Sequence, residues 1–597
     1  MSCRPSAHGI WFFLWIIPAL GSDEPPFSDE PMMVTASRTQ QPAAAVPARV
    51  SVITRDDIER IQPPDLLELL RLQAGVDMAR AGGPGAQTGV FLRGSNSNHV
   101  LVLIDGVRVS AAGTGAFTWE ILDPALIERI EIVRGPRAAR WGSDAIGGVI
   151  QIFTRRSDGP WARASYGRFR DRSLSVAIGD QSGPAPHDLS ASVRRVGGFS
   201  AQNERGFAFD PDNDGFRNAG ANAGGRYRLG GGELAWRGRV AAGEIEFDQG
   251  ESDFTNYSGT VEYFHRTAGA WQWLLSAGTL RDRLETETPF GVSEDITRRV
   301  QAGFQAERAL GADAAWMVGA DAWRESGISR GVWAESRYNL GVWTGMDGRR
   351  ADVDYELSLR VDEDENFGSA VTGNAGAGWW IGPRGRLFTN LGRGFRSPNF
   401  NQLFSLGFSG LFAGNTELDP EASWSLEVGA DWSPADGHLL TVSVYENRID
   451  DLIDFAGENF QAINIREARI RGLEAGYRLT GPAWRVEASA TWQDPEDRDT
   501  GNDLLRRPRE KYNLVIDRRL SGRHWLGAEI VHTGSRFDVG GVELPSHTLL
   551  NLRAGFGLGS GFGLSARLEN ALDRDYEPLF GFNAHRRSLF VALAWEG

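Results

Sequence analysis

The stretch Leu234-Ala235-Trp236-Arg237-Gly238-Arg239-Val240 has the alternation of an extended strand with two different faces. Successive side chains of a strand point to opposite sides, so one face carries Leu234, Trp236, Gly238 and Val240 and the other carries Ala235, Arg237 and Arg239. The same pattern recurs at 271–277 and 564–569, and many segments like these follow residue 158. Each segment therefore has one face suited to an apolar medium and one that tolerates charge.

A long run of such strands predicts a membrane β-barrel. A soluble β-sandwich would show the same alternation, but it would rarely need so many strands in one unbroken run or place Trp so often at strand ends. In a bilayer every backbone amide must be paired internally, so the sheet has to close. The stretch 158–597 holds about 440 residues, and at roughly 20 residues per strand it predicts about 22 antiparallel transmembrane strands.

The N-terminus predicts export. Arg4 and His8 precede an apolar run from Ile10 to Leu20, and Ala19-Leu20-Gly21 resembles a signal-peptidase site, so residues 1–21 are expected to be a removed signal. A short buried helix is the alternative. The single Cys, Cys3, lies inside this segment, which suits an oxidising compartment. Residues 22–47 are rich in Pro, Ser and Asp and are expected to form a flexible arm.

Residues 48–157 have a mixed pattern that predicts a small α/β domain. A strand at 50–54 leads into a helix opened by Thr54, with Asp57 three residues later as a capping box. Asp105-Gly106 separates two apolar segments and is typical of a tight hairpin. A barrel of about 22 strands has a lumen wide enough to need a plug, and we expect this domain to be that plug.

Composition excludes several classes of function. The net charge of -15 argues against a nucleic-acid partner, since phosphate binding requires an excess of Lys and Arg. The sequence contains no HExxH, Walker loop, nucleophile elbow or cluster of His and Cys ligands, so we expect no enzyme. After the first twenty residues no stretch is apolar enough for a membrane helix.

Several motifs resemble those of the TonB-dependent outer-membrane receptors, over essentially all of the mature chain. In the plug they are Phe91-Leu92-Arg93-Gly94, Val102 to Val107, Ile132 to Pro136 and Gly142 to Ile150, in the family's order. In the barrel they are Phe395 to Asn399, Leu418 to Glu421, Asn464 to Gly472 and Asn570 to Tyr576. The resemblance implies a monomeric barrel in the outer membrane of a Gram-negative bacterium, surrounded by lipid.

The resemblance also implies an energy-coupling partner. The segment Met33-Val34-Thr35-Ala36-Ser37, within 31–38, is similar to the TonB box, which pairs as an added strand with a sheet edge of TonB. A disordered arm with a chance Val-Thr-Ala is the other interpretation. TonB would pull on this arm, using the energy of the inner membrane, and part of the plug would move.

Within the family, the likeness is greatest to its cobalamin transporters, through His99 to Arg108 and Trp141 to Gly148. It implies active import of cobalamin or a related corrinoid. The positions that it assigns to ligand contact are Gln87, Gly89, Asn96, Thr114 and Gly115 in the plug and Arg506 in the barrel wall. A ferric siderophore is the alternative ligand, although the loop 81–89 is small and polar where aromatic and Arg-rich loops would be expected. A passive porin is the other class, but a porin gains nothing from a plug.

An acidic loop predicts bound calcium. Asp210, Asp212 and Asp214 alternate and are followed by Gly215, so several hard oxygens can converge on one Ca²⁺. The twelfth position is Ala221 and not Glu, which excludes an EF-hand. The resemblance adds Asp248 from a neighbouring loop, with Asp253 as a weaker candidate, and places Ser200 where the family has a further aspartate. A solvated acidic turn is the alternative.

Overall fold

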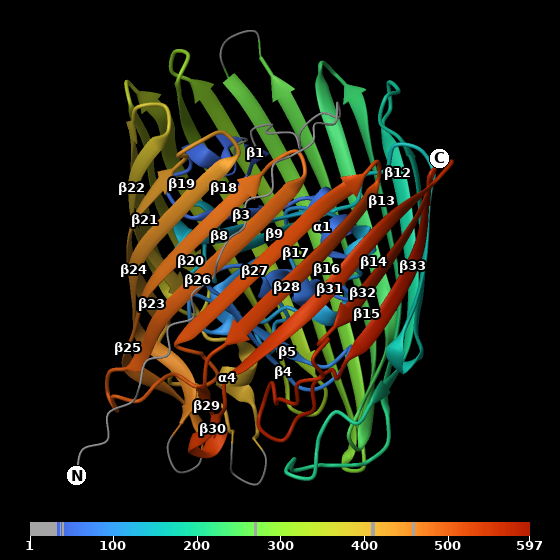
Figure 1. Ribbon diagram of the computed structural model, residues 1–597. Helices are drawn as coiled ribbons and strands as arrows, with labels where there is room; N and C mark the ends of the chain where they lie inside the picture. Colours follow the sequence, from blue (N-terminus) through green and yellow to red (C-terminus); the bar gives the residue numbers. More distant parts are fainter. Residues whose placement is uncertain (1–32, 36–37, 39–40, 268–270, 408–411, 457–459) are drawn as a thin grey trace, which may run out of the picture.

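The computed structural model describes residues 33–35, 38, 41–267, 271–407, 412–456 and 460–597. In it, 22 strands form one closed barrel of antiparallel neighbours around the N-terminal domain (Figure 1). The last strand pairs with the first, so the sheet has no open edge. The predicted barrel of about 22 strands with an internal plug is confirmed. The predicted signal at 1–21, the arm up to residue 32, and Ala36 and Ser37 of the TonB box lie outside the described residues.

The barrel strands range in length from 7 residues in the first to 20 residues in β25 (Gln461–Thr480). The first eleven are β10 (Trp161–Gly167), β11 (Asp171–Asp180), β12 (His187–Phe199), β13 (Asp214–Leu229), β14 (Gly232–Phe247), β15 (Gly250–Arg266), β16 (Trp271–Thr288), β17 (Gly291–Ala309), β18 (Ala314–Ser329), β19 (Trp333–Arg350) and β20 (Val353–Asp364). The others are β21 (Gly368–Ile381), β22 (Gly385–Arg396), β23 (Glu421–Trp432), β24 (His438–Ala456), β25 (Gln461–Thr480), β26 (Trp484–Asp497), β27 (Glu510–Ser521), β28 (His524–Thr533), β31 (His547–Gly559), β32 (Phe562–Glu569) and β33 (Ser588–Glu596).

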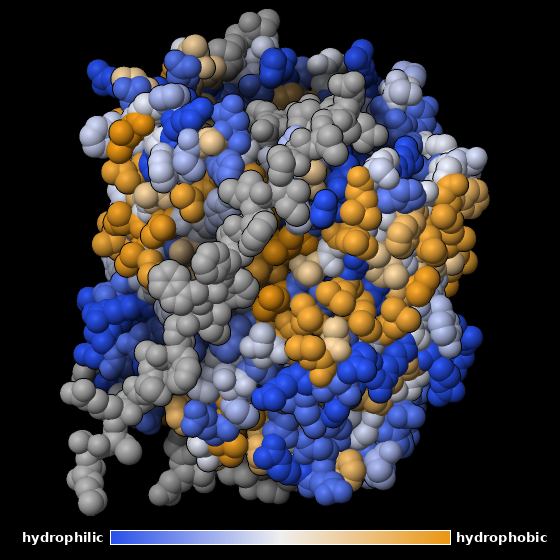
Figure 2. All heavy atoms as spheres, in the orientation of Figure 1, coloured by the Kyte–Doolittle hydropathy of each residue, from blue (hydrophilic) through white to orange (hydrophobic). Residues whose placement is uncertain are grey.

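The wall has an apolar outside and a polar inside, as the alternation predicts. In β14, Val240 is 45% exposed whereas its neighbour Arg239 is buried against the plug. Figure 2 shows a belt of apolar side chains across the middle of the visible face, with hydrophilic residues above and below it. An apolar belt between polar rims is the outer surface of a barrel that sits in lipid. No helix among the described residues is long and apolar enough to cross a membrane.

The plug is a five-stranded sheet with short helices. Its strand order is β3 (Val50–Ile53), β8 (Ile127–Arg134), β9 (Gly148–Thr154), β6 (Val100–Ile104) and β7 (Val107–Arg108). Its other elements are β4 (Val76–Arg80), β5 (Thr88–Leu92), α1 (Arg55–Ile61), α2 (Leu66–Arg71), α3 (Ala138–Trp141), and the 3-10 turns η1 (Ala43–Ala45), η2 (Ser97–His99), η3 (Trp119–Ile121) and η4 (Pro124–Leu126). The predicted boundary between 157 and 158 falls in the connection from β9 to β10.

Two local predictions in the plug are confirmed by geometry. Thr54 caps α1, and its side chain and that of Asp57 each accept a backbone N–H of the other residue, which completes the capping box. Asp105 and Gly106 have φ angles of 46° and 82°, the positive values that a tight hairpin between β6 and β7 requires. Both features depend only on neighbouring residues, and the sequence therefore specifies them directly.

The two rims of the barrel differ in the length of their connections. The C-terminal rim, which holds Gly597, has short turns such as 230–231, 351–352 and 522–523. The opposite rim, called the loop rim here, carries the longer segments 200–213, 397–420, 498–509, 534–546 and 570–587. These segments include α4 (Phe400–Phe404), β29 (Arg536–Asp538), η6 (Val539–Gly541) and β30 (Val542–Leu544), which lie at the bottom of Figure 1. The short turn between β10 and β11 is η5 (Arg168–Arg170).

A charge placed on the apolar belt should destabilise the barrel. Val342, near the middle of β19, is 59% exposed on the outer face. We expect Val342→Arg to cost about 2–4 kcal/mol of unfolding free energy in lipid vesicles, because a guanidinium at the bilayer midplane loses its hydration. Urea unfolding followed by tryptophan fluorescence would measure the loss. The control Val342→Leu should unfold like the wild type, and an Arg variant as stable as that control would contradict a lipid-facing position.

Candidate functional site

Buried ion pairs hold the plug against one side of the barrel wall. Arg93, at the end of β5, donates hydrogen bonds to Glu427 of β23 at 2.6 Å and to Glu474 of β25 at 2.9 and 3.0 Å. Its guanidinium also lies 4.3 Å from the ring centre of Tyr445 on β24. The side chains of Arg93 and both glutamates are only 4% exposed. Charges this far from water are stable only when paired, so this cluster fixes the plug to three adjacent strands.

A second buried cluster lies closer to the loop rim. His99 of η2 contacts both carboxylate oxygens of Glu421 at 3.0 Å, and Glu421 also accepts a hydrogen bond from Arg396. Arg396 and Glu421 face each other at the ends of β22 and β23. Arg396 and Glu421 belong to the motifs 395–399 and 418–421 through which the sequence resembles the family. The contact with His99 joins the plug to the strands from which the longest loop of the rim begins.

Five of the six predicted ligand positions meet at one place on the plug surface. Gln87 and Thr114 are exposed at the tips of two plug loops that point toward the loop rim. Both loops adjoin the segment 96–98, since a Cβ at Gly89 would lie 3.8 Å from the Cβ of Ser97, and one at Gly115 would lie 3.2 Å from the Cβ of Asn98. Gly115 has a φ of +68°, a conformation that favours glycine. The structure thus gathers Gln87, Gly89, Asn96, Thr114 and Gly115 into one surface.

The sixth predicted position, Arg506, occupies a loop and not a wall strand. It lies in the connection between β26 and β27, and its Nε donates to Asp538 at 2.7 Å. Its neighbour Arg507, which sequence reasoning missed, makes the contact with the plug: it donates to the side chain of Asn96 and to the carbonyl oxygen of Gly94, and lies 4.1 Å from the ring centre of Phe91. Arg507 therefore positions Asn96 from the barrel side.

A loop-rim residue supports the other plug loop. Asn399 donates a hydrogen bond from its amide to the backbone carbonyl of Thr114 at 2.9 Å. It also caps α4, where its side chain accepts from the backbone of Gln402. The motif 395–399 was the sequence signal for this residue, but the motif alone gave no sign that it reaches the plug.

The acidic loop brings carboxylates together without a basic neighbour inside the cluster. Asp248 accepts from the backbone N–H groups of Gln202 at 2.8 Å and Asp210 at 3.0 Å, and Asp214 accepts from that of Ala201. Burial, and then the charges of Asp210, Asp248 and Glu246, raise the pKa of the exposed Asp212. The hydroxyl of Ser200 donates to the carbonyl oxygens of Gln202 and Asp210.

Calcium chemistry agrees with this donor set only in part. Mutual repulsion among the carboxylates is what a divalent cation would relieve, and Asp210, Asp212 and Asp214 offer oxygen ligands. Within the described part of the chain, however, no group of three or more His, Cys, Asp or Glu side chains is arranged to hold a metal ion. Asp248 is occupied by backbone N–H groups, and Asp253 lies on β15 opposite Glu244 and Glu285. A bound ion would therefore require the loop to rearrange.

The described part of the predicted TonB box is docked on the plug. Met33–Val34 forms strand β1, which pairs antiparallel with β2 (Gln41–Pro42). Val34 is fully buried among Val46, Ala48, Val52 and Val133. Thr35 donates from its backbone to Glu131 at 2.9 Å. The backbone of Met33–Val34 is paired with β2 and the Val34 side chain is buried. This segment must therefore detach from the plug before another protein can add a strand to it.

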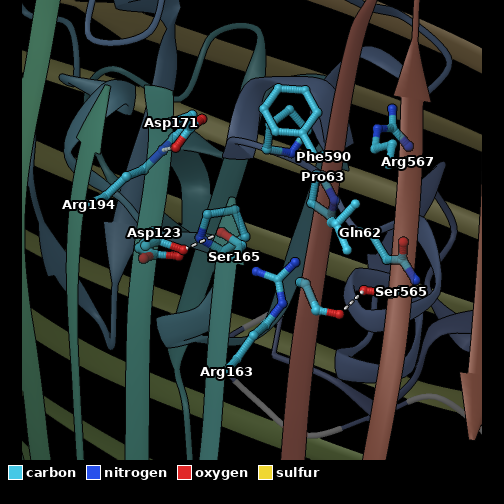
Figure 3. Close-up of a pocket in the computed structure, with 15 residues that line it drawn as sticks. Gln62, Pro63, Asp123, Arg163, Ser165, Asp171, Arg194, Ser565, Arg567 and Phe590 are labelled. Carbon is cyan, nitrogen blue, oxygen red and sulfur yellow. Dashed lines mark hydrogen bonds and ion pairs between the residues drawn. The ribbon is translucent and has the colours of Figure 1, made fainter. Parts of the chain in front are cut away.

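Two cavities lie between the plug and the barrel wall at the C-terminal rim. An open cavity of about 450 Å³ lies between α1 and the wall, and a smaller one of about 40 Å³ shares several of its lining residues. Figure 3 shows the smaller cavity: Gln62, Pro63 and Asp123 come from the plug, whereas Arg163, Arg194 and Arg567 come from wall strands. Arg567 also donates to the carbonyl oxygen of Ile61 at 2.8 Å, so polar contacts border this space.

Comparison with known proteins identifies the family. The model described as TonB dependent receptor-like, beta-barrel matches residues 154–571, and that of the TonB-dependent Receptor Plug Domain matches residues 42–149. The chain belongs to the TonB-dependent receptors, which are outer-membrane transport proteins of Gram-negative bacteria and not enzymes. The loop rim is accordingly the extracellular one, because barrels of this membrane have short periplasmic turns and longer extracellular loops.

Individual relatives differ in how much of the sequence they share. The chain is 29% identical over 591 residues to the Vitamin B12 transporter BtuB of Vibrio vulnificus strain YJ016, with 92% of each chain covered. A crystal structure of the ferric enterobactin receptor PfeA of Pseudomonas aeruginosa matches with a TM-score of 0.79 and 17% identity, covering 95% of this chain and 100% of that one. The siderophore receptor PirA of Acinetobacter baumannii gives 0.78 and 15%, with the same coverage.

Removing Arg93 should loosen the plug. Arg93→Met would leave the buried Glu427 without its cation and Glu474 with only the longer contact to Arg134 at 3.8 Å, and we expect a loss of about 3–5 kcal/mol in the stability of the plug within the barrel. Hydrogen exchange of the β4 and β5 amides as a function of urea would measure it. As a control, Arg217→Met removes an exposed pair with Glu244 and should cost less than about 1 kcal/mol. Equal losses in both variants would contradict the anchoring role.

Proposed function

We propose that this receptor imports cobalamin or a closely related corrinoid across the outer membrane. The observation that carries the proposal is the 29% identity to a vitamin B12 transporter across 92% of both chains. The siderophore receptors share the architecture at 17% and 15% identity, which supports the fold alone. Receptors of one fold carry different ligands, so the ligand has to be argued from the binding surface.

The chemistry of the plug surface supports a large, polar ligand without strong net charge. Its exposed tips are Gln87 and Thr114, which offer an amide and a hydroxyl. The two nearby arginines are already engaged, Arg506 with Asp538 and Arg507 with Asn96 and the backbone of Gly94. A ferric siderophore that carries negative charge would favour cations free to meet it. This surface instead offers hydrogen-bonding groups, which suit the amide-rich periphery of a corrinoid.

Transport in this proposal depends on release of the docked arm. Ligand bound at Asn96 and Thr114 contacts two plug loops that are tied to the barrel through Arg507 and Asn399. A shift of these loops would weaken the packing of the plug, and β1 would leave β2. TonB would then add a strand to the segment 33–37 and draw on it. The barrel supplies no energy and keeps its shape.

We further propose that Ca²⁺ orders the acidic loop 200–213. Asp210, Asp212 and Asp214 would hold it, with Asp248 joining if its backbone contacts rearrange. The ion would offset the repulsion that, after burial, raises the pKa of Asp212. A fastened loop would preserve the extracellular side of the binding surface, since Ala201 packs against Gly82 at the start of the plug loop 82–89.

Binding of cyanocobalamin to the purified receptor in detergent tests the ligand. We expect a saturable complex by equilibrium titration, and at least tenfold weaker binding in Thr114→Trp, because the indole would occupy the exposed loop tip. Ser182→Trp, in a turn at the opposite rim, is the matched control and should bind as the wild type does. Binding of ferric enterobactin and not of cyanocobalamin would replace the corrinoid by a siderophore.

Asp212→Asn should raise the melting temperature in the absence of calcium and reduce the stabilisation that calcium gives. In chelator, the variant should melt at a higher temperature than the wild type, because it removes one of the mutually repelling carboxylates. In millimolar Ca²⁺, the wild type should gain stability and the variant should gain little. Differential scanning calorimetry would measure both. Glu335→Gln, an exposed acid on β19, should change neither response, and a wild type indifferent to Ca²⁺ would rule out the ion.

A further inference from the structure

A cavity lined by many titratable side chains lies between the plug and the wall on the side of β27, β28 and β31. Its volume is about 70 Å³, which exceeds the space that one water needs. The plug contributes Glu68 and Arg71 of α2 and Asp77 and Arg80 of β4. The wall and the loop rim contribute Lys511, Arg536, His547, Tyr576 and His585, among others. The cavity therefore joins two surfaces that the plug must separate when it moves.

The cavity is rich in hydrogen-bond donors without acceptors. Arg71 Nε, Arg80 Nη2 and Arg536 Nη1 are all buried, and none has a hydrogen-bond partner among the described residues. A buried guanidinium N–H without an acceptor costs free energy, so three such nitrogens around one cavity indicate a missing acceptor.

The charge of the lining defines the chemistry of that acceptor. Four cationic side chains, from Arg71, Arg80, Lys511 and Arg536, face two carboxylates, from Glu68 and Asp77. Arg71 pairs with Glu68, and Arg80 pairs at 2.8 Å with Asp65, which lies outside the lining. Burial and then the positive charge of Arg80 lower the pKa of His585 to about 3, so this imidazole is neutral near pH 7. The surroundings therefore favour an anion, and guanidinium groups match the oxygens of a phosphate.

We propose that this cavity is a binding site for one oxyanion of the phosphate class, held between α2 and β4 of the plug and the barrel wall. The anion accepts hydrogen bonds from Arg71 and Arg80 on the plug and from Arg536 on the loop rim. It thereby links the plug to the barrel through a group that can leave. This site is separate from the proposed corrinoid surface and does not depend on the identity of the imported ligand.

Calorimetric titration of inorganic phosphate into the full-length receptor tests the site. The protein is kept in non-ionic detergent and in buffer free of phosphate and sulfate. We expect one site in the wild type and at least about tenfold weaker binding in Arg71→Gln, which removes a charged donor. Arg55→Gln removes the same charge from α1, outside this cavity, and should bind as the wild type does. No binding, or equal binding in both variants, would overturn the proposal.

Crystals of the wild type grown with arsenate give a second readout that does not depend on a variant. An anomalous arsenic peak among Arg71, Arg80 and Arg536 supports the site, whereas water molecules alone at saturating arsenate overturn it.

Addition of cyanocobalamin to receptor loaded with radioactive phosphate separates two sources of the anion. Retention of phosphate would assign the site to the free ion, and release would overturn the separation of this site from the corrinoid surface. Failure of cyanocobalamin to bind would contradict only the proposed function.

Discussion

The need to pair every backbone N–H and C=O within the bilayer is the constraint on which the whole molecule depends. A sheet in lipid cannot have an edge, and here the pairing of β33 with β10 removes it. Closure at 22 strands creates a lumen that is too wide for wall side chains to fill, and the plug occupies it. The inward face of each strand then meets protein instead of lipid, so it can carry Arg and Glu. The ion pairs that hold the plug are thus a consequence of how the barrel closes.

Local features could be predicted from the sequence, and long-range ones could not. The strand at 234–240, the capping box of Thr54 and Asp57, and the Asp105-Gly106 hairpin depend on residues a few positions apart, and the structure has all three. Resemblance placed Gln87, Gly89, Asn96, Thr114 and Gly115 near one another. The contact of Arg507 with Asn96 joins residues 411 positions apart, and Arg93 reaches Glu474 across 381. Such contacts depend on the register of the whole barrel, which no short segment encodes.

Plug and wall meet through many polar groups. The clusters around Arg93 and His99, the cavity near Arg71 and the contact of Arg567 with Ile61 all place charged or hydrogen-bonding side chains at the interface. Apolar contacts would stabilise the interface to a comparable degree, but they would expose hydrophobic surface to water whenever the plug moved. Polar groups can exchange their protein partners for water. The hydrogen bonds and ion pairs of this interface are therefore strong while water is excluded and weaker once water enters. This property suits a closure that must open and then reseal.

The position of β3 determines how a pull on the arm enters the plug. β3 is an edge strand of the plug sheet, it follows the arm directly, and it pairs only with β8 in that sheet. Tension applied through the arm therefore arrives at Val50 and strains the Val50–Val133 pair before any other rung of the sheet. The residue pairs between β3 and β8 would then separate one after another. The other four strands of the sheet would bear no tension until β3 has detached. A mechanical input at this edge needs far less peak force than one that shears the sheet as a block.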